Sequence, residues 1–218
     1  MSAPQPCEAR HFGVYPAIVT DIVDPDGLGR IQARFPWLGA GGDDVRAWAT
    51  LCTPYADDDE GIEFLPSVGT QVVVAFEAGD LRRPYILGSA WNGREALPEA
   101  PQAPNDKRLV KTRSGSLLEF DDGAGAEKVT LSMAAGHRLV LDNGGQTVTL
   151  SHANGALLEI DAAGRVSVTA NSTMELTASV LNVHAPVANF DGMVTCTTVI
   201  CNTGVVSPSY TPGAGNIW

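Results

Sequence analysis

The sequence predicts an all-β protein, and three observations support this class. Glycine and proline are frequent, with 23 and 14 of 218 residues, while signals for helix starts and ends are nearly absent, which favours strands joined by tight turns. Residues 12–91 alternate turn clusters with short strand-like runs. Residues 115–169 hold a repeat of about 20 residues with two strand-like runs in each, a period typical of stacked β-structure rather than a globular core.

The first of these regions, residues 12–91, is predicted to form a small closed or nearly closed β-barrel. Clusters rich in Asp, Pro and Gly favour chain reversals and separate the strands. The strand candidates are 14–23, 29–38, 45–52, 70–77 and 84–90. The apolar residues expected to build its core are Ile18, Ile31, Phe35, Trp37, Trp48, Leu51, Phe64, Val72, Val74, Phe76, Ile86 and Leu87.

A connector follows at residues 94–106, with three prolines and little periodicity. Such a composition predicts an extended, semi-stiff segment. Residues 107–113 then lead into the repeat.

The repeat consists of three phrases that open with Gly, alternate apolar and polar residues, and close on Asp: 115–121, 136–142 and 155–161. A second alternating run follows each phrase, at 129–132, 148–151 and 166–169. Alternation gives each strand one apolar and one polar face. Because one such ribbon is too thin to bury its apolar face alone, it needs a second layer, from its own coils or from other copies. We favour an oligomeric β-prism or β-helix, built as a trimer.

Beyond residue 170 the composition changes, because residues 171–218 contain no Lys or Arg and only Glu175 and Asp191 as acidic residues. Strand-like runs continue at 174–183, 187–190 and 194–200. A β-prone segment with so little charge would aggregate as a loose strand, so we expect it to be paired between intertwined chains. The turn-rich ending at 204–218 is expected to be a cap or docking surface.

Composition excludes several classes of protein. The net charge of −11 argues against binding a polyanion through bulk electrostatics, and residues 1–106 carry seven Lys and Arg against sixteen Asp and Glu. No apolar run is long enough to span a membrane as a helix, and we expect no signal peptide at the N-terminus. The cysteines, Cys7, Cys52, Cys196 and Cys201, form no CxxC pair; reduced thiols and a disulfide between copies near Cys196 or Cys201 are both open.

The residue types that carry catalysis or metal binding form no recognisable site. We therefore predict no catalytic residues, no cofactor-binding residues and no metal ligands. Asp121, Asp142 and Asp161 precede Gly-rich turns, which favours turn formation over catalysis or calcium binding. The acidic run 57–60 is predicted to be a solvated loop between barrel strands rather than a cation site. The histidines His11, His137, His152 and His184 show no ligand spacing, and no Ser or Cys has a recognisable base nearby. Trp37, Trp48 and Trp91 are expected in the core or an interface rather than on a base-stacking platform.

Several segments of the N-terminal region resemble a known domain, in order and in spacing: 15–37, 46–48, 61–69, 72–74 and 79–88. They are similar to the OB-fold domain of phage baseplate assembly protein V, which also occurs in VgrG spikes of type VI secretion and contractile injection systems. The repeat from Gly115 onward resembles the β-helical needle that follows this domain.

This resemblance implies a homotrimeric central spike that joins the tail hub to the tip and pierces the host envelope when the sheath contracts. The implied partners are hub and tail-tube proteins at the OB domain and the host outer membrane, with no stable nucleic-acid binding. At the C-terminus two alternatives stay open, a separate PAAR-like tip protein and a tip closed by the chain itself. The implied location is the tail baseplate of a virion or a contractile injection particle. The expected divisions are an N-terminal arm at 1–11, the OB-fold domain at 12–93, a Pro-rich linker at 94–107, a β-helical repeat region at 108–191 and a spike tip at 192–218.

The sequence departs from short phage spikes in one respect. Many of them carry a His-x-His motif that binds iron near the tip, whereas His184 has no partner at that spacing. We therefore expect no tip metal and no cofactor. Two other functions are weighed against the spike: a nucleic-acid- or glycan-binding OB module with a β-structured tail, and a β-helical polysaccharide hydrolase. The parent machine, whether phage tail, tailocin or extracellular injection system, stays open.

Overall fold

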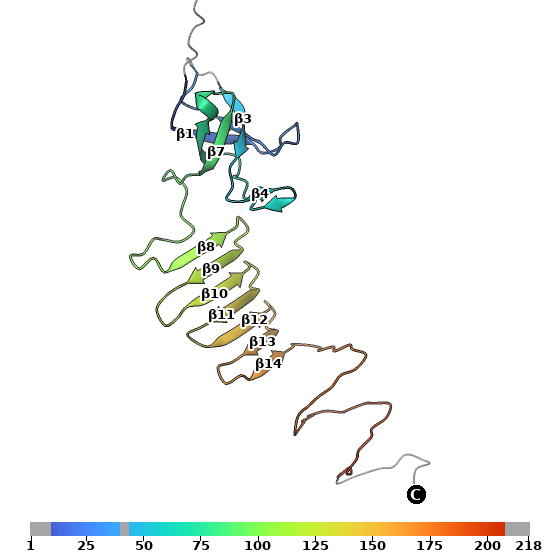
Figure 1. Ribbon diagram of the computed structural model, residues 1–218. Helices are drawn as coiled ribbons and strands as arrows, with labels where there is room; N and C mark the ends of the chain where they lie inside the picture. The colour runs from blue at the N-terminus through green and yellow to red at the C-terminus, as the bar shows by residue number, and fades with distance from the viewer. Residues whose placement is uncertain (1–9, 40–43, 208–218) are drawn as a thin grey trace, which may run out of the picture. The chain divides into compact units, whose positions relative to one another are not determined.

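The computed structural model describes residues 10–39 and 44–207 (Figure 1), and within them the chain is all-β. Its strands form a closed barrel, a small hairpin and a seven-stranded sheet. The expectations for Cys7, for most of the N-terminal arm and for the last part of the spike tip lie outside the described residues.

Five strands close the barrel, as the turn pattern predicted, and they are neighbours in the order β1-β2-β3-β7-β6, with β6 returning to β1. Strands β3 and β7 run parallel, and the other neighbouring strands run antiparallel. This is the arrangement of a small OB-type barrel. The strand bounds are β1 Val14–Asp21, β2 Ile31–Arg34, β3 Arg46–Leu51, β6 Gln71–Phe76 and β7 Pro84–Ser89.

The barrel core follows the two-residue alternation of its strands. The buried apolar side chains are Ala17, Val19, Ile31, Ala33, Phe35, Ala49, Val72, Val74, Phe76 and Ile86. Six expected core residues are absent from this set. Two of them, Trp37 and Leu51, are partly buried and pack against it, and Trp48 is half-buried in β3. Ile18 lies between the inward-facing Ala17 and Val19, and Leu87 follows the inward-facing Ile86, so both point away from the core. Phe64 is 69% exposed because it lies outside the barrel strands.

Two local clusters fix the ends of β1. Near its start, the Tyr15 and Trp37 rings stack with centroids 4.4 Å apart, and Trp37 Nε1 donates to the Pro16 carbonyl at 2.9 Å. After its end, Arg30 donates twice to the Asp24 carboxylate, from Nε at 2.8 Å and Nη2 at 2.9 Å. These charge-assisted bonds hold the pKa of Asp24 well below its usual range. They also hold the turn between β1 and β2 closed.

A short hairpin and a helical turn complete this region. Strands β4 (Ala56–Asp57) and β5 (Glu60–Gly61) pair with each other between β3 and β6 in the sequence. A 3₁₀ turn at Glu77–Gly79 follows β6, and the His11 amide donates to the Gly79 carbonyl at 3.0 Å.

The connector is folded rather than extended, contrary to expectation. The chain bends at residues 98–99 and turns at 103–104, and the Asn105 amide donates to the Gln102 carbonyl at 3.0 Å. Glu99 then lies 3.6 Å from Lys107 at the start of the next strand. Bends and a turn between the spaced prolines thus interrupt the extended path expected for the connector.

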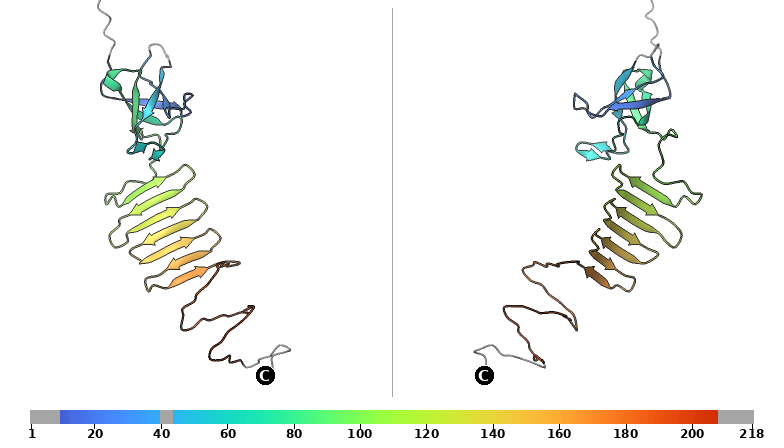
Figure 2. Two further views of the ribbon diagram at one scale, coloured as in Figure 1. Left: turned by 45° about the vertical axis from the view of Figure 1, so that its right-hand side comes forward. Right: turned by 180° about the vertical axis from the view of Figure 1, so that it is seen from behind.

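The repeat forms one antiparallel meander in which each strand pairs with its sequence neighbours (Figure 2). The repeated phrases become β9, β11 and β13, and the second runs become β10, β12 and β14. Within one chain this is a single-layered ladder rather than a coil. The strands are β8 Lys107–Lys111, β9 Leu117–Asp121, β10 Lys128–Ser132, β11 Arg138–Asp142, β12 Thr147–Ser151, β13 Leu157–Ile160 and β14 Val166–Thr169.

Residues 170–207 form an extended path without strand pairing, so the runs predicted at 174–183, 187–190 and 194–200 are not strands of this chain. Every described residue of this tail is exposed. A strand needs a neighbour for its backbone groups, and no other described segment of the same chain pairs with the tail. Backbone bends interrupt the path at 171–172, 179, 186, 191–192, 197 and 202–203.

Candidate assembly interface

The ladder register gathers most apolar side chains of the seven-stranded sheet into two rows on one face. Four others lie on the opposite face: Leu109, Leu117, Val140 and Leu157. Residues directly opposite each other in a ladder lie on the same face. One row, starting beside Arg108, contains Phe120, Val129, Leu141, Val148 and Ile160. The other contains Val110, Leu118, Leu131, Leu139, Leu150 and Leu158. We call these eleven residues the apolar sheet face.

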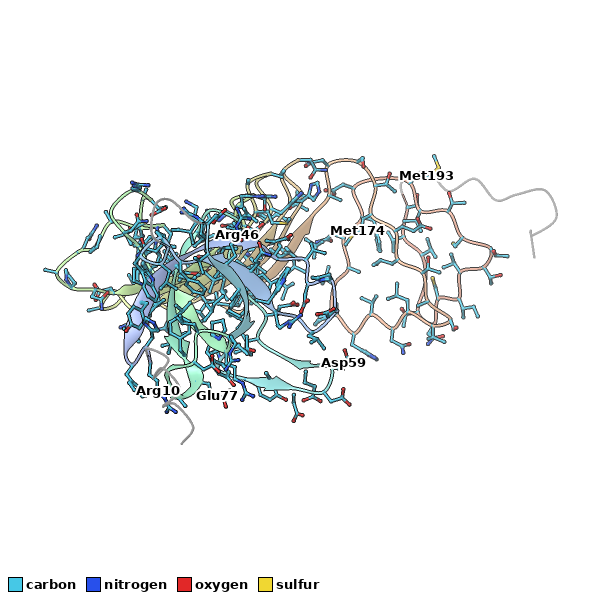
Figure 3. The ribbon with its side chains drawn as sticks, turned by 90° about the horizontal axis from the view of Figure 1, so that it is seen from above. Arg10, Arg46, Asp59, Glu77, Met174 and Met193 are labelled. Atoms are coloured by element: carbon cyan, nitrogen blue, oxygen red, sulfur yellow. The ribbon has the colours of Figure 1, made fainter. Side chains whose placement is uncertain are left out.

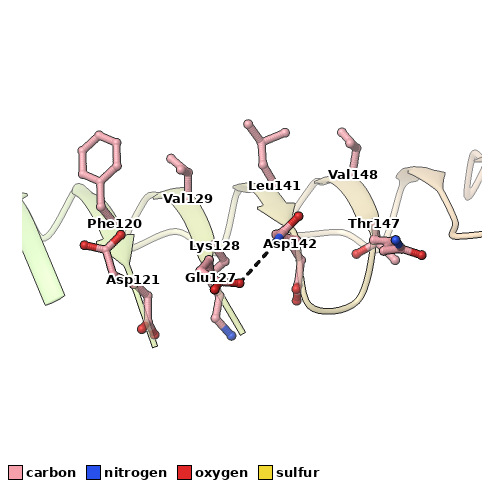
Figure 4. Close-up of a pocket in the computed structure, with 12 residues that line it drawn as sticks. Phe120, Asp121, Glu127, Lys128, Val129, Leu141, Asp142, Thr147 and Val148 are labelled. Atoms are coloured by element: carbon pink, nitrogen blue, oxygen red, sulfur yellow. Dashed lines mark hydrogen bonds between the residues drawn. The ribbon is translucent and has the colours of Figure 1, made fainter. Parts of the chain in front are cut away.

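Figure 4 shows one end of this arrangement, where Phe120, Val129, Leu141 and Val148 point to one side of the sheet. The charged residues Asp121, Lys128 and Asp142 point away from them. A one-residue slip of any strand would exchange these two sets. The register of the sheet is therefore specified by the sequence.

Charges on the opposite face strengthen that register. Lys107, Asp121, Lys128 and Asp142 lie opposite one another in four successive strands, with alternating sign. Opposite charges in cross-strand pairs favour the native pairing. The carboxylate of Glu119, 3.7 Å from Lys107, raises the pKa of that lysine together with Glu99.

The apolar sheet face is uncovered in the described chain. Its members Val110, Phe120, Leu131, Leu139, Leu141, Leu150, Leu158 and Ile160 are between 36% and 53% exposed, whereas core side chains of the barrel are at most 7% exposed. Val166 and Val168 of β14 are 61% and 50% exposed. So continuous an apolar surface marks a candidate interaction surface.

Glycines at the start of each phrase permit the close stacking of turns along one edge of the sheet. Gly115, Gly136 and Gly155 have φ of +86°, +96° and +92°, which is unfavourable for other residues. A Cβ on Gly115 would lie 3.3 Å from the Ala134 Cβ, and one on Gly136 would lie 3.4 Å from the Ala153 Cβ. The repeat of glycine thus has a steric cause.

The repeated aspartates form turns, as predicted. The Asp121 carboxylate accepts the Gly123 amide at 3.1 Å, and that of Asp142 accepts the Gly145 amide at 2.7 Å. Asp161 accepts the amides of Ala163 and Arg165, each at 3.0 Å, and these backbone bonds, above all that from Arg165, lower its pKa. These carboxylates are used to hold the chain reversals.

The acidic run 57–60 lies in the β4–β5 hairpin and is exposed, which confirms the expected solvated loop between barrel strands. Across residues 10–39 and 44–207, no three His, Cys, Asp or Glu side chains come together in a way that could hold a metal ion.

Two histidines come together that sequence spacing did not connect. The His137 and His152 rings lie with centroids 4.3 Å apart. They lie one residue beyond the Arg138–Ser151 pair of the β11–β12 ladder, so the register of the repeat would have revealed them. His11 packs instead against Tyr15, Trp37 and Phe76, and His184 is exposed in the tail.

The remaining singled-out residues are distributed over the molecule. Trp37 packs against the barrel core. The Arg30 guanidinium lies over the Trp48 ring, with Cζ 5.9 Å from the ring centroid. Trp91 is 63% exposed and is not part of the core. Cys52, Cys196 and Cys201 are exposed free thiols in the chain, so a disulfide between copies stays a prediction.

The barrel matches a known family. Residues 15–91 match the type VI secretion system/phage-baseplate injector OB domain, and the strand order above is that of an OB barrel. The chain therefore carries a baseplate-injector OB domain, and its resemblance to VgrG-like baseplate spikes is confirmed.

Three relatives illustrate the similarity. The type VI secretion system spike protein VgrG3 of Vibrio cholerae is 27% identical over 113 residues, covering 49% of this chain and 11% of the relative. The actin cross-linking toxin VgrG1 of Vibrio cholerae is 25% identical over 128 residues, covering 52% and 12%. The type VI secretion system spike protein VgrG1b of Pseudomonas aeruginosa is 23% identical over 128 residues, covering 54% and 17%. The match thus spans less than a fifth of the length of each of these relatives.

Among the described residues, no helix has the length and apolar character needed to cross a bilayer.

Proposed function

We propose that this chain is a structural central spike of a contractile phage tail or related injection system, in which three copies assemble through the apolar sheet face. The uncovered face is the observation that carries the proposal. Spike proteins among the relatives make the baseplate the setting in which such an assembly would act.

Assembly around a common axis accounts for the sheet and the tail together. Three ladders facing one axis would bury their apolar rows as the sides of a prism and keep the charged face in water. The tail has short extended segments between bends five to seven residues apart, and no pairing of its own. Such a path suits winding around sister chains, whose strands would supply the missing hydrogen bonds.

A dimer would account for the apolar sheet face but not for the tail. A pair of ladders could form a sandwich, but the tail beyond Thr169 would still need neighbours along its bent path. A third chain supplies them and closes the ring without free edges. The proposed trimer therefore rests on the tail as well as on the sheet.

The proposed role is mechanical. A needle that transmits the force of sheath contraction into an envelope must resist buckling and unravelling. Intertwined chains cannot separate one at a time, so unfolding is slow even where equilibrium stability is ordinary. The OB barrel (12–93) joins the hub and tail tube, the linker (94–107) connects it to the needle (108–191), and the tip (192–218) receives a PAAR-like cap before entering the host outer membrane.

The role is proposed to be non-enzymatic. One relative is named as a toxin, but the match covers 12% of it, and the aspartates of the repeat are engaged in turns. The barrel's acidic surface does not favour the alternative of an OB module that binds nucleic acid.

Deletion and complementation test the spike role. Cells that produce the particle but lack this chain are expected to lose envelope penetration, measured as infection or killing of target cells. Wild-type chain restores penetration. Unchanged infection or killing by particles shown by mass spectrometry to lack the chain would overturn the proposal.

A further inference from the structure

The segment between β3 and β6 is a preformed projection that contributes almost nothing to the barrel core. We call residues 52–69 the acidic arm; it contains the β4–β5 hairpin. Pro66 is the single buried residue in it. Figures 1 and 3 show the hairpin outside the barrel strands, with Asp59 near its outer end.

The arm is ordered by its own bonds. The Ile62 amide donates to the Tyr55 carbonyl at 3.0 Å, and the Thr53 hydroxyl donates to the Ile62 carbonyl at 2.5 Å. The Tyr55 hydroxyl donates to the Glu60 carboxylate. A Cβ at Gly61 would lie 2.8 Å from the Tyr55 carbonyl oxygen, so only glycine fits there without a shift. The sequence thus specifies a defined shape for a segment that the barrel core does not need.

The surface of the arm is apolar to an unusual degree for a solvated loop. Its large apolar side chains are 42–69% exposed: Tyr55, Ile62, Phe64, Leu65 and Val68. Several exposed apolar side chains on one preformed element favour an interaction surface.

The charges of the arm are all negative, and none has a cationic partner within the described residues. Asp57, Asp58, Asp59, Glu60 and Glu63 form no ion pair there, and residues 47–81 contain no Lys or Arg. The barrel arginines are engaged elsewhere. Arg30 pairs with Asp24, Arg34 and Arg46 with Asp44, Arg82 with Asp80, and Arg83 with Glu77.

We propose that the acidic arm docks on a different baseplate protein, whose surface offers an apolar centre rimmed by Lys and Arg. The barrel of a second copy suits the arm poorly, because its arginines already have carboxylate partners and the net charge of the chain is −11. Nucleic acid and anionic lipid would be repelled by the five carboxylates. The identity of the partner as a baseplate component rests on the proposed function, while the docking surface rests on the arm itself.

Site-specific photo-crosslinking in producing cells tests the proposal. A benzophenone amino acid replaces Phe64 in the full chain, and the crosslinked peptide is identified by mass spectrometry. A matched probe replaces Val14, an exposed apolar residue of β1 outside the arm. We expect the Phe64 probe to capture a different protein at an apolar segment flanked by Lys or Arg, at least tenfold above the Val14 probe.

Charge reversal in the arm makes the test specific. Asp58→Lys with Glu63→Lys is expected to reduce that crosslink at least tenfold. Glu95→Lys with Asp106→Lys, which changes net charge equally outside the arm, leaves it within twofold. Crosslinks from Phe64 only to this same chain, or none above the Val14 probe, would overturn the docking proposal. The oligomeric mass of each variant is measured in parallel, so loss of the trimer, which would contradict the proposed function, is distinguished from loss of docking alone.

Discussion

Placing a charge on the apolar sheet face is expected to abolish assembly while leaving each chain folded. Leu150→Asp is the most direct change, because Leu150 lies in the middle of the sheet in the leucine-rich row and is 53% exposed in the single chain. The neighbouring Ser151 points to the opposite face. Ser151→Asp is therefore a matched control that adds the same charge one residue away.

The magnitude follows from the area still exposed. Burying a whole leucine side chain contributes about 1.5–3 kcal/mol, so burying the exposed half contributes about 1 kcal/mol per copy and about 3 kcal/mol per trimer. Leu150→Ala would therefore weaken trimer association about 100-fold, since about 1.4 kcal/mol is tenfold. Leu150→Asp adds a desolvation cost of several kcal/mol for each buried carboxylate. The summed desolvation cost of three buried carboxylates is expected to exceed the free energy of trimer association at micromolar concentration.

Size-exclusion chromatography with light scattering measures the result, and far-ultraviolet circular dichroism checks that strands remain. We expect wild type and Ser151→Asp to be trimers and Leu150→Asp to be a monomer with retained β signal. The reasoning is refuted if Leu150→Asp remains a trimer of wild-type affinity, or if Ser151→Asp dissociates to the same extent.

Further predictions address the barrel and the turns. Phe35→Ala removes a fully buried core side chain and should destabilise the barrel by about 3–5 kcal/mol in denaturant titration, with an effect under 1 kcal/mol contradicting the assigned core. Gly136→Val places a β-branched residue at φ +96° beside Ala153 and should destabilise the sheet by about 1–2 kcal/mol; an unchanged unfolding midpoint would show that the turn tolerates it. Because Arg30 depresses the folded-state pKa of Asp24, this carboxylate stabilises the fold above its unfolded pKa of about 4 and loses that contribution as pH falls below it. Asp24→Asn should therefore flatten the acid limb of a pH titration of melting temperature, and a parallel acid limb would count against the pairing.

The strands of the ladder and barrel could be predicted because period-two alternation and turn residues are local properties. The three repeated phrases became β9, β11 and β13 for this reason, and the aspartates that close them formed the expected turns. The sequence predicted that the repeat would need a second layer, since an alternating ribbon has an apolar face. It did not predict which residues form that face. Pairing Leu139 with Leu150 requires aligning two strands across a turn, and that alignment was not assigned residue by residue from the sequence.

The failures have non-local causes. Ile18 was expected in the core because its type is apolar, but the direction of β1 puts Ala17 and Val19 inward. Phe64 belongs to an arm whose apolar residues face outward. The strands expected in the tail stay a prediction, because they were expected to pair between chains and the structure holds one chain. His137 and His152 meet across two strands, which no linear spacing shows.

The mass of the full chain under native conditions tests the central claim most directly. Native mass spectrometry at micromolar concentration should give a species of three times the 22.8 kDa chain mass. A species at the mass of one chain, folded by circular dichroism, would contradict assembly through the apolar sheet face.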